Sequence, residues 1–490
     1  MNLHRMLRAT KAAYFLGGAA SFFLAALLLT GCSTSVVPGT GNNIGSQAVS
    51  VPVLITDAPS DQLVAFTLTL NSITLTDSTG KTASILPTPT TIEICHLNGI
   101  QAPLVTASIP EDTYTSATLT FSGPQIAYIN SSGQPVSVTP TLATTSYTFT
   151  FPTPFTVSNT STSLLVDLLA GQSVAIAGST VTVTPVFSLK PVPPASTTPP
   201  SGQNGTGMQQ MGTVVSVSGT SLVIEPGSGP NFTLTTNSAT VLQGFTALSA
   251  LTAGELVQVD FIVSQACAQN LGATVQCTPP VYLATRIQLA PPPPSGGQQP
   301  NLLNGPVTAV SSGSFKMVIM QGLGPAVSPV AASAVSVFTI TTTNSTTFAI
   351  APQFVSLSGL PFTPTFTSAN LTPGQSVGVS TSSVSGTTAT ASSVNLIPQT
   401  LGGTVTAIAT SGNYTAYTLS LVSGNAFTEL SGASTVTVYT STATAGPVAS
   451  TNSTPIKVGS QVRFNGLVFN TGSGAFSMVA GCSPDGPPGN

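Results

Sequence analysis

Apolar and polar residues alternate along much of this 490-residue chain, in short runs bounded by turn residues. The runs VAFTLTLNSITLT at 64–76 and ATLTF at 117–121 follow this pattern, and turn segments such as STGK and SSGQP lie between runs. Successive side chains of a strand point to opposite faces of a sheet, so the alternation predicts strands with one buried face. Short strands at this spacing predict a β-sandwich over residues 51–190.

Three landmarks recur in the same order beyond residue 207. They are a Gly-x-Val segment, then a turn glycine that leads into a strand, and finally a short strand that closes the unit and is barely recognisable in the third copy, near 475–480. The Gly-x-Val glycines are 93 and 98 residues apart, which suits one small domain per copy because solenoid repeats are about 20 to 50 residues long. The copies are GTVVSV at 212–217, GPVTAV at 305–310 and GTVTAI at 403–408; LTAGELVQVDF at 251–261, LTPGQSVGVS at 371–380 and IKVGSQVRF at 456–464; and ATRIQL at 284–289 and SSVNL at 392–396.

Composition also favours strands. Charged residues are 4% of the sequence, against about 25% in ordinary domains, and Ser, Thr, Asn and Gly take their place. β-Branched Thr and Val suit a pleated sheet, while 40 prolines and 45 glycines interrupt the chain too often for long helices. With 41% hydrophobic residues the chain can fill cores, which disfavours disorder.

The first 31 residues have the pattern of an export signal. Arg5, Arg8 and Lys11 precede an apolar stretch, which is interrupted by glycine and serine and has no positive stop-transfer cluster behind it. The segment Leu29-Thr30-Gly31-Cys32 resembles the lipobox of bacterial lipoproteins. This resemblance implies cleavage between Gly31 and Cys32 and acylation of the Cys32 sulfur, and two or three acyl chains anchor firmly where one does not.

Two further resemblances concern the domains. The segments VPVLITDAP at 51–59, IPEDTYTSATLTF at 109–121 and 164–187 resemble a domain family of unknown function common in bacterial envelope lipoproteins, although Glu111-Asp112 replaces the small residues and glycine expected there. The three later units resemble another family of unknown function, a small barrel-like β domain often found in tandem, and an OB-like barrel is the predicted form. Neither resemblance implies an activity.

The predicted fold class is therefore all-β: an N-terminal β-sandwich followed by three small OB-like β-barrel repeats, with Pro/Gly-rich linkers. The expected segments are a lipoprotein signal peptide at 1–31, a tether at 32–50, the β-sandwich at 51–190, a linker at 191–210, β-barrel repeat 1 at 211–290, a linker at 291–302, β-barrel repeat 2 at 303–398 and β-barrel repeat 3 at 401–482.

Charge disfavours a nucleic-acid partner. Removal of Arg5, Arg8 and Lys11 leaves six scattered basic residues against 12 acidic ones, whereas binding to phosphates needs clustered Lys or Arg. The expected partners are the membrane, through the lipid anchor, and an unidentified envelope or extracellular molecule.

Candidate chemistry is sparse in the sequence. The mature chain keeps one histidine, His96, and we expect it on the solvent face of a strand, opposite Cys95, because adjacent strand residues point apart. The densest acidic set of the first domain is Asp57, Asp61, Glu111 and Asp112, which offers oxygen ligands for calcium. The competing interpretation makes Asp57 a turn former that accepts backbone N–H bonds before Pro59. No other cofactor is indicated.

Four cysteines follow Cys32. In an exported domain Cys267 and Cys277, which flank a short loop, are expected to form a local disulfide across a hairpin. Cys95 and Cys482 could bridge the first domain to the last, and free or partner-linked thiols remain open for both.

These observations favour a lipid-anchored protein of the bacterial envelope or cell surface that acts as a non-catalytic structural or binding scaffold. Ser33 follows the lipidated position, where an aspartate retains many lipoproteins at the inner membrane, so resemblance points to the outer membrane. The alternative is a hydrolase of envelope polymers that uses the carboxylates of the N-terminal domain, and it requires those carboxylates to converge in a cleft.

Overall fold

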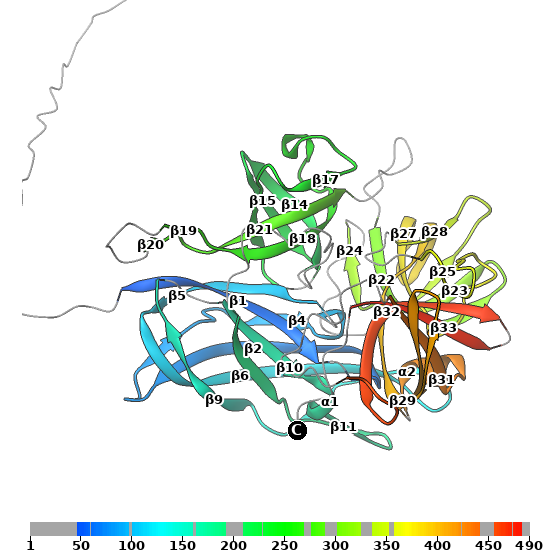
Figure 1. Cartoon of the computed structure of the whole chain (residues 1–490), viewed down its shortest axis with the longest axis horizontal. Helices are drawn as coiled ribbons and strands as arrows, with labels where there is room; N and C mark the ends of the chain where they lie inside the picture. Colours follow the sequence, from blue (N-terminus) through cyan, green and yellow to red (C-terminus); the bar gives the residue numbers. More distant parts are fainter. Residues whose placement is uncertain are drawn as a thin grey trace, which may run out of the picture. The chain divides into compact units, whose positions relative to one another are not determined.

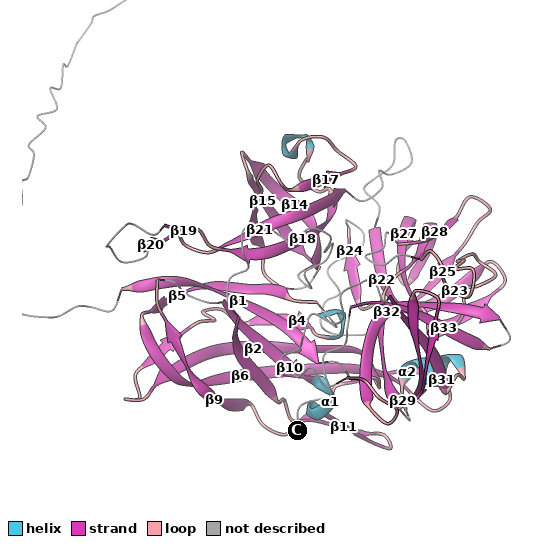
Figure 2. Ribbon diagram, in the orientation of Figure 1, coloured by secondary structure: helices cyan, strands magenta, loops and turns pink. Residues whose placement is uncertain are grey.

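Strands dominate the chain, and the predicted all-β fold class is confirmed (Figure 2). Short helical turns, α1 (Ala170–Ser173), α2 (Ala426–Ser431), η1 (Cys95–Leu97) and η2 (Leu248–Ala250), lie between strands. The computed structural model describes residues 47–58, 60–97, 100–159, 163–192, 209–227, 229–268, 276–289, 301–324, 336–351, 357–422, 424–441, 455–472 and 474–482.

The first domain is a β-sandwich (Figure 1). One sheet has the order β13-β10-β1-β5, and in it β1 and β10 run parallel. The other has the order β3-β2-β6-β7, with β4 also paired to β2 and β9 to β6, and a small third sheet is ordered β11-β12-β8. The strands are β1 (Ala48–Ala58), β2 (Leu63–Asp77), β3 (Thr82–Ser84), β4 (Thr90–Glu93), β5 (Ala102–Pro110), β6 (Asp112–Ile129), β7 (Pro135–Val138), β8 (Thr141–Leu142), β9 (Ser146–Val157), β10 (Ser163–Leu169), β11 (Val174–Ala177), β12 (Thr180–Val183) and β13 (Phe187–Val192).

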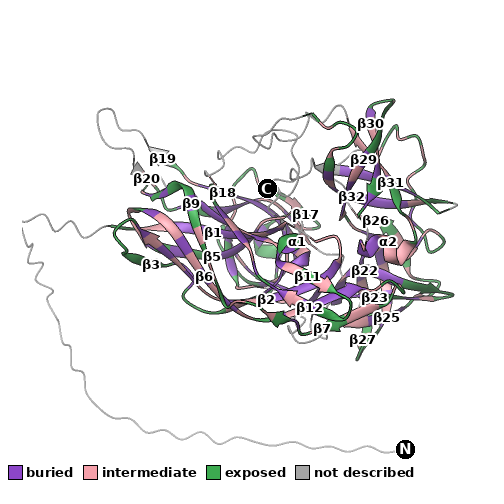
Figure 3. Cartoon of the chain, turned by 90° about the horizontal axis from the view of Figure 1, so that it is seen from below, coloured by how far each residue is buried: buried purple, intermediate pink, exposed green. Residues whose placement is uncertain are grey.

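Alternation along the strands builds the core of this sandwich. In β2, Ile73 and Leu75 are buried, while the following residues Thr74 and Thr76 are each partly exposed. Figure 3 colours the strands by burial and shows buried segments along the strands of this domain. The buried residues join those of the facing sheet, such as Val53, in one apolar cluster. Because the side-chain period of a strand is two, the alternation in the sequence gives the sheet one buried face and one solvent-exposed face.

The three repeats form three five-stranded barrels with one topology. In each, the strands pair in the order first, second, third, fifth, fourth and back to first, and the third and fifth strands are parallel. Barrel 1 has β14 (Gln209–Ser218), β15 (Ser221–Pro226), β16 (Phe232–Thr235), β18 (Leu256–Ser264) and β21 (Val281–Leu289); barrel 2 has β22 (Asn301–Ser311), β23 (Ser314–Val318), β25 (Val337–Thr341), β27 (Ser376–Ser385) and β28 (Thr388–Leu396); barrel 3 has β29 (Gln399–Ser411), β30 (Tyr414–Leu421), β31 (Thr435–Ser441), β32 (Gln461–Gly472) and β33 (Ala475–Cys482). Short strands beside them are β17 (Val241–Gln243), β19 (Cys267–Ala268), β20 (Gln276–Cys277), β24 (Gln321–Leu323) and β26 (Thr347–Ile350).

The first two sequence landmarks recur because they bond to each other. In barrel 3, the N–H of turn Gly459 donates to the carbonyl of Val405 at 2.8 Å, and the Val405 N–H donates to the carbonyl of Ser460 at 2.9 Å. Gly459 has a φ of +90°, which favours glycine, and Val405 belongs to the Gly-x-Val segment. Barrels 1 and 2 repeat both bonds through Val214 and Val307.

The glycine of each Gly-x-Val segment lies where two strands approach closely. A Cβ atom added at Gly403 would collide with the carbonyl oxygen of Ser420 on the next strand, and one at Gly305 with that of Val318. Directly after the valine of the Gly-x-Val segment, the pairing of the first strand with the second shifts by one residue in all three barrels. Such bulges bend a strand, which lets the first strand pair with both neighbours of a small closed barrel.

The domains also share cores. Residues 46–490 form one compact unit, in which Leu54 and Leu165 of the sandwich belong to the apolar cluster of barrel 1. Leu467 and Phe469 of barrel 3 belong to the cluster of barrel 2. Of the predicted linkers 191–210 and 291–302, residues 193–208 and 291–300 lie outside the described residues. The ends of both linkers belong to strands, since β13 extends to Val192, β14 begins at Gln209 and β22 begins at Asn301.

Candidate functional site

Asp57 lies in the last part of β1 and is 1% exposed. Neither of its carboxylate oxygens has a hydrogen-bond partner, so the interpretation of Asp57 as a turn former is wrong. Burial, followed by the negative charges of Asp167 and Glu93, raises the pKa of Asp57 well above its ordinary value, although the backbone at Ala170 and the charge of Arg463 oppose this. Asp57 therefore favours the neutral acid form, because a buried charge without partners is costly.

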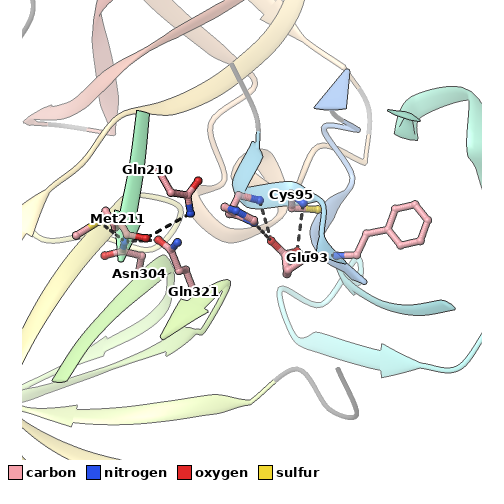
Figure 4. Close-up of polar contacts among 8 residues, drawn as sticks. Glu93, Cys95, Gln210, Met211, Asn304 and Gln321 are labelled. Carbon is pink, nitrogen blue, oxygen red and sulfur yellow. Dashed lines mark hydrogen bonds and ion pairs between the residues drawn. The ribbon is translucent and has the colours of Figure 1, made fainter. Parts of the chain in front are cut away.

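Glu93 is the centre of a second polar group at the end of β4. Its carboxylate accepts hydrogen bonds from the backbone N–H groups of Phe66 at 3.0 Å, Cys95 at 3.2 Å and His96 at 2.8 Å (Figure 4). It also lies 3.1 Å from Nδ1 of His96. Three N–H donors compensate the buried carboxylate, and two of them belong to η1, so Glu93 closes this turn in the way of a helix cap.

His96 and Cys95 do not have the environment that the sequence pattern predicted. β4 ends at Glu93 and both residues lie in η1, so the expectation of a strand with His96 on its solvent face is wrong. The His96 side chain is 8% exposed, and its Nε2 atom has no hydrogen-bond partner. Cys95 is a free, buried thiol. Burial, then the charges of Glu93 and Asp57, raises its pKa, which opposes formation of the nucleophilic thiolate.

A small cavity borders this group. His96, Leu97, Pro103 and Gly229 are among its lining residues, and its volume is about 10 Å³, room for about one water. Among the described residues, no group of three His, Cys, Asp or Glu side chains is placed to hold a metal ion. The Asp57–Glu93–His96 region is thus a closed polar cluster inside the sandwich, with little space for a substrate.

The four carboxylates predicted as a calcium site do not come together. In the β1–β5 pair, Ala48 lies opposite Pro110, which places Glu111 and Asp112 beside the start of β1. Asp57 lies nine residues further along β1, about 30 Å away at about 3.3 Å per residue. The predicted calcium site is therefore wrong, because its carboxylates do not lie together. For the same reason these carboxylates do not converge in a cleft, as the hydrolase interpretation requires.

Asp61 instead joins the first domain to the last. Its Oδ2 atom accepts a hydrogen bond from Nη2 of Arg463 at 3.0 Å, and the two side chains are 6% and 22% exposed. The backbone carbonyl of Asp61 accepts from the N–H of Ala426 at 2.7 Å, at the start of α2. These residues are about four hundred positions apart in the chain. No local sequence signal could reveal this pair, because its partner is set by how the domains pack.

Neighbouring barrels have their own polar contacts. Nδ2 of Asn304 in barrel 2 donates to Oε1 of Gln321 at 3.2 Å and lies 3.4 Å from the sulfur of Met211 in barrel 1 (Figure 4). Nε2 of Gln375 in barrel 2, which is fully buried, donates to the carbonyl of Val468 in barrel 3 at 2.9 Å. The contacts of Asn304 with Met211 and of Gln375 with Val468 join different repeats, so no pattern within one repeat predicts them.

The cysteine pair lies in the short β19–β20 hairpin. Cys267 is directly opposite Cys277 in the antiparallel register, and Cys277 is disulfide-bonded. Opposed residues in such a pair have Cα atoms about 4.5 to 5.5 Å apart, which suits a disulfide. The register supports the predicted Cys267–Cys277 bond, which stays a prediction. Cys95 is free, so the bridge to Cys482 is absent from the structure.

Gly31, Cys32 and residues 33–46 of the predicted tether lie outside the described residues. The end of the predicted tether is corrected, because Ala48, Val49 and Ser50 already belong to β1 and pair with β5. Within the described part of the chain, no helix is both long and apolar enough to cross a membrane.

Residues 48–234 match the family model described as "Domain of unknown function (DUF4382)", so a domain of this kind is present in the all-β chain. The match begins with β1 and ends within β16, so it includes the sandwich and the first three strands of barrel 1. Among solved structures, "drosophila Unr CSD456" is 11% identical, with 56% of this chain and 95% of that chain covered, at a TM-score of 0.11. The search of curated proteins found no match.

Proposed function

We propose that this chain is a lipid-anchored protein of the bacterial envelope, exposed at the outer membrane or cell surface, that serves as a non-catalytic structural or binding scaffold. The observation that carries the scaffold role is the continuity of cores and polar contacts between domains, from the shared residues Leu54 and Leu165 to the Asp61–Arg463 ion pair. Domains packed in this way act as one body, because separating them would expose apolar surface and unpair buried charges.

The lipobox resemblance at Cys32 supports the anchor. An acylated amino terminus followed by the polar stretch 33–47, which precedes β1, would hold the first domain away from the bilayer at a root-mean-square distance of about 19 to 23 Å. The polar cluster around Asp57 supports the non-catalytic role, because its thiol is held protonated and its cavity has room for about one water.

Metabolic labelling with a fatty-acid analogue tests the anchor. Wild type should take up label and sediment with membranes, Cys32→Ala should remain unlabelled, and Thr34→Ala, two residues away, should behave as wild type. Equal labelling of wild type and Cys32→Ala would refute acylation at this position.

A second assay tests the non-catalytic role. Purified chain is incubated with isolated envelope polymers, and we expect no release of soluble fragments. Fragment release that is lost in Asp57→Asn would favour the hydrolase alternative.

A further inference from the structure

The outer face of the larger sandwich sheet carries a grid of hydroxyl groups. Thr74 of β2 lies opposite Thr118 of β6, and Thr118 lies opposite Thr148 of β9. The neighbouring row pairs Ser72 with Thr120. Opposed residues of antiparallel strands share one face, so these side chains stand side by side. We call Ser72, Thr74, Thr76, Thr118, Thr120 and Thr148 the hydroxyl face.

The spacing of the grid follows from strand geometry. Neighbouring strands are about 4.8 Å apart, and same-face residues along a strand are about 6.7 Å apart. Hydroxyls touch across strands, with Ser72 Oγ 2.6 Å from Thr120 Oγ1 and Thr118 Oγ1 3.1 Å from Thr148 Oγ1. Threonine has few χ1 rotamers, so these contacts hold the array in a repeated orientation before any partner arrives.

The hydroxyl face is exposed to solvent, whereas a neighbouring part of the same outer side of the sheet is covered by the barrels. All six of its residues are partly or fully exposed. On the same outer side of β2 and β6, Val64 and Ala127 are buried in a cluster with Val318 of barrel 2 and Ala426 of barrel 3. The outer side of one sheet therefore changes from apolar residues, where the barrels cover it, to hydroxyls, where they do not.

The charge of this face restricts its partner. The segments 69–76, 116–122 and 146–150 contain no Asp, Glu, Lys, Arg or His. A charged polymer would lose hydration here without gaining an opposite charge. Each hydroxyl both donates and accepts, which matches a partner whose groups also do both, and a regular grid matches a partner with regular repeats. Single neutral hydrogen bonds are weak, so affinity must come from many simultaneous contacts.

We propose that the hydroxyl face binds a neutral polysaccharide through hydrogen bonds in register with its repeating hydroxyls. This proposal names a ligand class for the binding scaffold proposed above. It rests on that proposed function in one respect, that the domain is displayed on the outside of the cell. Glycan binding is measured with purified chain and does not depend on acylation. A negative result in the fatty-acid labelling experiment therefore does not affect the glycan-binding experiment, and the reverse also holds.

The test is retention of the full chain on microcrystalline cellulose and on chitin, with carboxymethyl cellulose as a charged probe of the same backbone. The double variant Thr74→Val/Thr118→Val removes two hydroxyls and keeps the β-branched shape. Thr233→Val, on an exposed position of β16 in barrel 1, is the matched control. We expect wild type and control to be retained on a neutral glycan, with affinity at least about tenfold weaker in the double variant, since each lost contact also weakens its neighbours in a multivalent array.

Several outcomes would overturn the proposal. They are equal retention of wild type and double variant, stronger retention on the carboxymethyl form, and no retention on cellulose or chitin. Inhibition of ice growth without glycan retention would assign the face to ordered water instead. A melting curve for each variant shows whether it is folded, and if the double variant is unfolded, the single variant Thr148→Val, at an exposed edge position, replaces it.

Discussion

Replacing Asp57 with Asn should stabilise the protein, and the gain should grow with pH. The folded chain holds Asp57 without hydrogen-bond partners and beside Asp167 and Glu93, so its pKa is raised well above 3.8. In the unfolded chain the same carboxyl loses its proton near its ordinary value. The unfolded state therefore binds fewer protons than the folded state in the interval between the two pKa values, and the free energy of unfolding falls as pH rises through it.

The size of the effect follows from linkage. Each pH unit within that interval removes about 1.4 kcal/mol from the stability of wild type. The side-chain amide of the Asp57→Asn variant has no acidic proton to lose, so the stability of the variant lacks this contribution. The stability difference between Asp57→Asn and wild type should be small below pH 3.8, increase by about 1.4 kcal/mol per pH unit above it, and level off at the folded-state pKa.

Urea unfolding followed by circular dichroism between pH 3.5 and 7 measures this difference, since the chain has no tryptophan. Asp77→Asn is the matched control with the opposite sign. Burial acts to raise the pKa of Asp77, but hydrogen bonds from Thr79 and Lys81 outweigh it and lower that pKa. Asp77→Asn should thus lose stability near neutral pH and less in acid. Parallel curves for wild type and Asp57→Asn from pH 3.8 to 7 would refute the reasoning.

Three further predictions concern the barrels and the contacts between domains. Gly403→Ala should cost about 2 to 3 kcal/mol in chemical unfolding, because its Cβ has no room, and a neutral effect would contradict the account of the Gly-x-Val glycine. Asp61→Ala and Arg463→Met should each lower the free energy of unfolding by about 2 kcal/mol, because each leaves a largely buried charge unpaired. If the double variant loses the sum of the two single losses, the two side chains are not coupled. Peptide mapping without reductant should find Cys267 linked to Cys277, which the chain-entropy model values at about 2 to 3 kcal/mol, and free alkylation of both would exclude the bond.

Much of the architecture was predictable from local sequence. Alternation of apolar and hydroxyl residues in β2 determines which face of that strand is buried, because the side-chain period of a strand is two. The Gly-x-Val and turn-glycine landmarks mark all three barrels, because closing a small barrel needs a close approach of strands and a positive φ at the same two places each time. These are demands of the backbone, and they recur wherever the fold recurs.

The candidate site was less predictable. Asp57 and Asp61 are four residues apart in the sequence, yet one is buried without partners and the other pairs with Arg463 of barrel 3. His96 was expected on a strand. It lies in η1 instead, where the Glu93 carboxylate accepts a hydrogen bond from its backbone N–H. Such outcomes depend on residues that are distant in the chain, whose positions local patterns do not determine.

The sequence by itself determined the all-β class, the barrel repeats and the buried face of each sheet, because these depend on residue periodicity and on the backbone freedom of glycine. Only the tertiary structure decided which polar residues would be buried, paired or exposed. Asp57, Asp61 and Thr74 all lie in or beside the first strands, and what covers each one is set by how sheets and barrels pack. Packing changes the local dielectric and the available partners, and these two quantities control whether a polar side chain stabilises the fold, titrates, or stays free to bind.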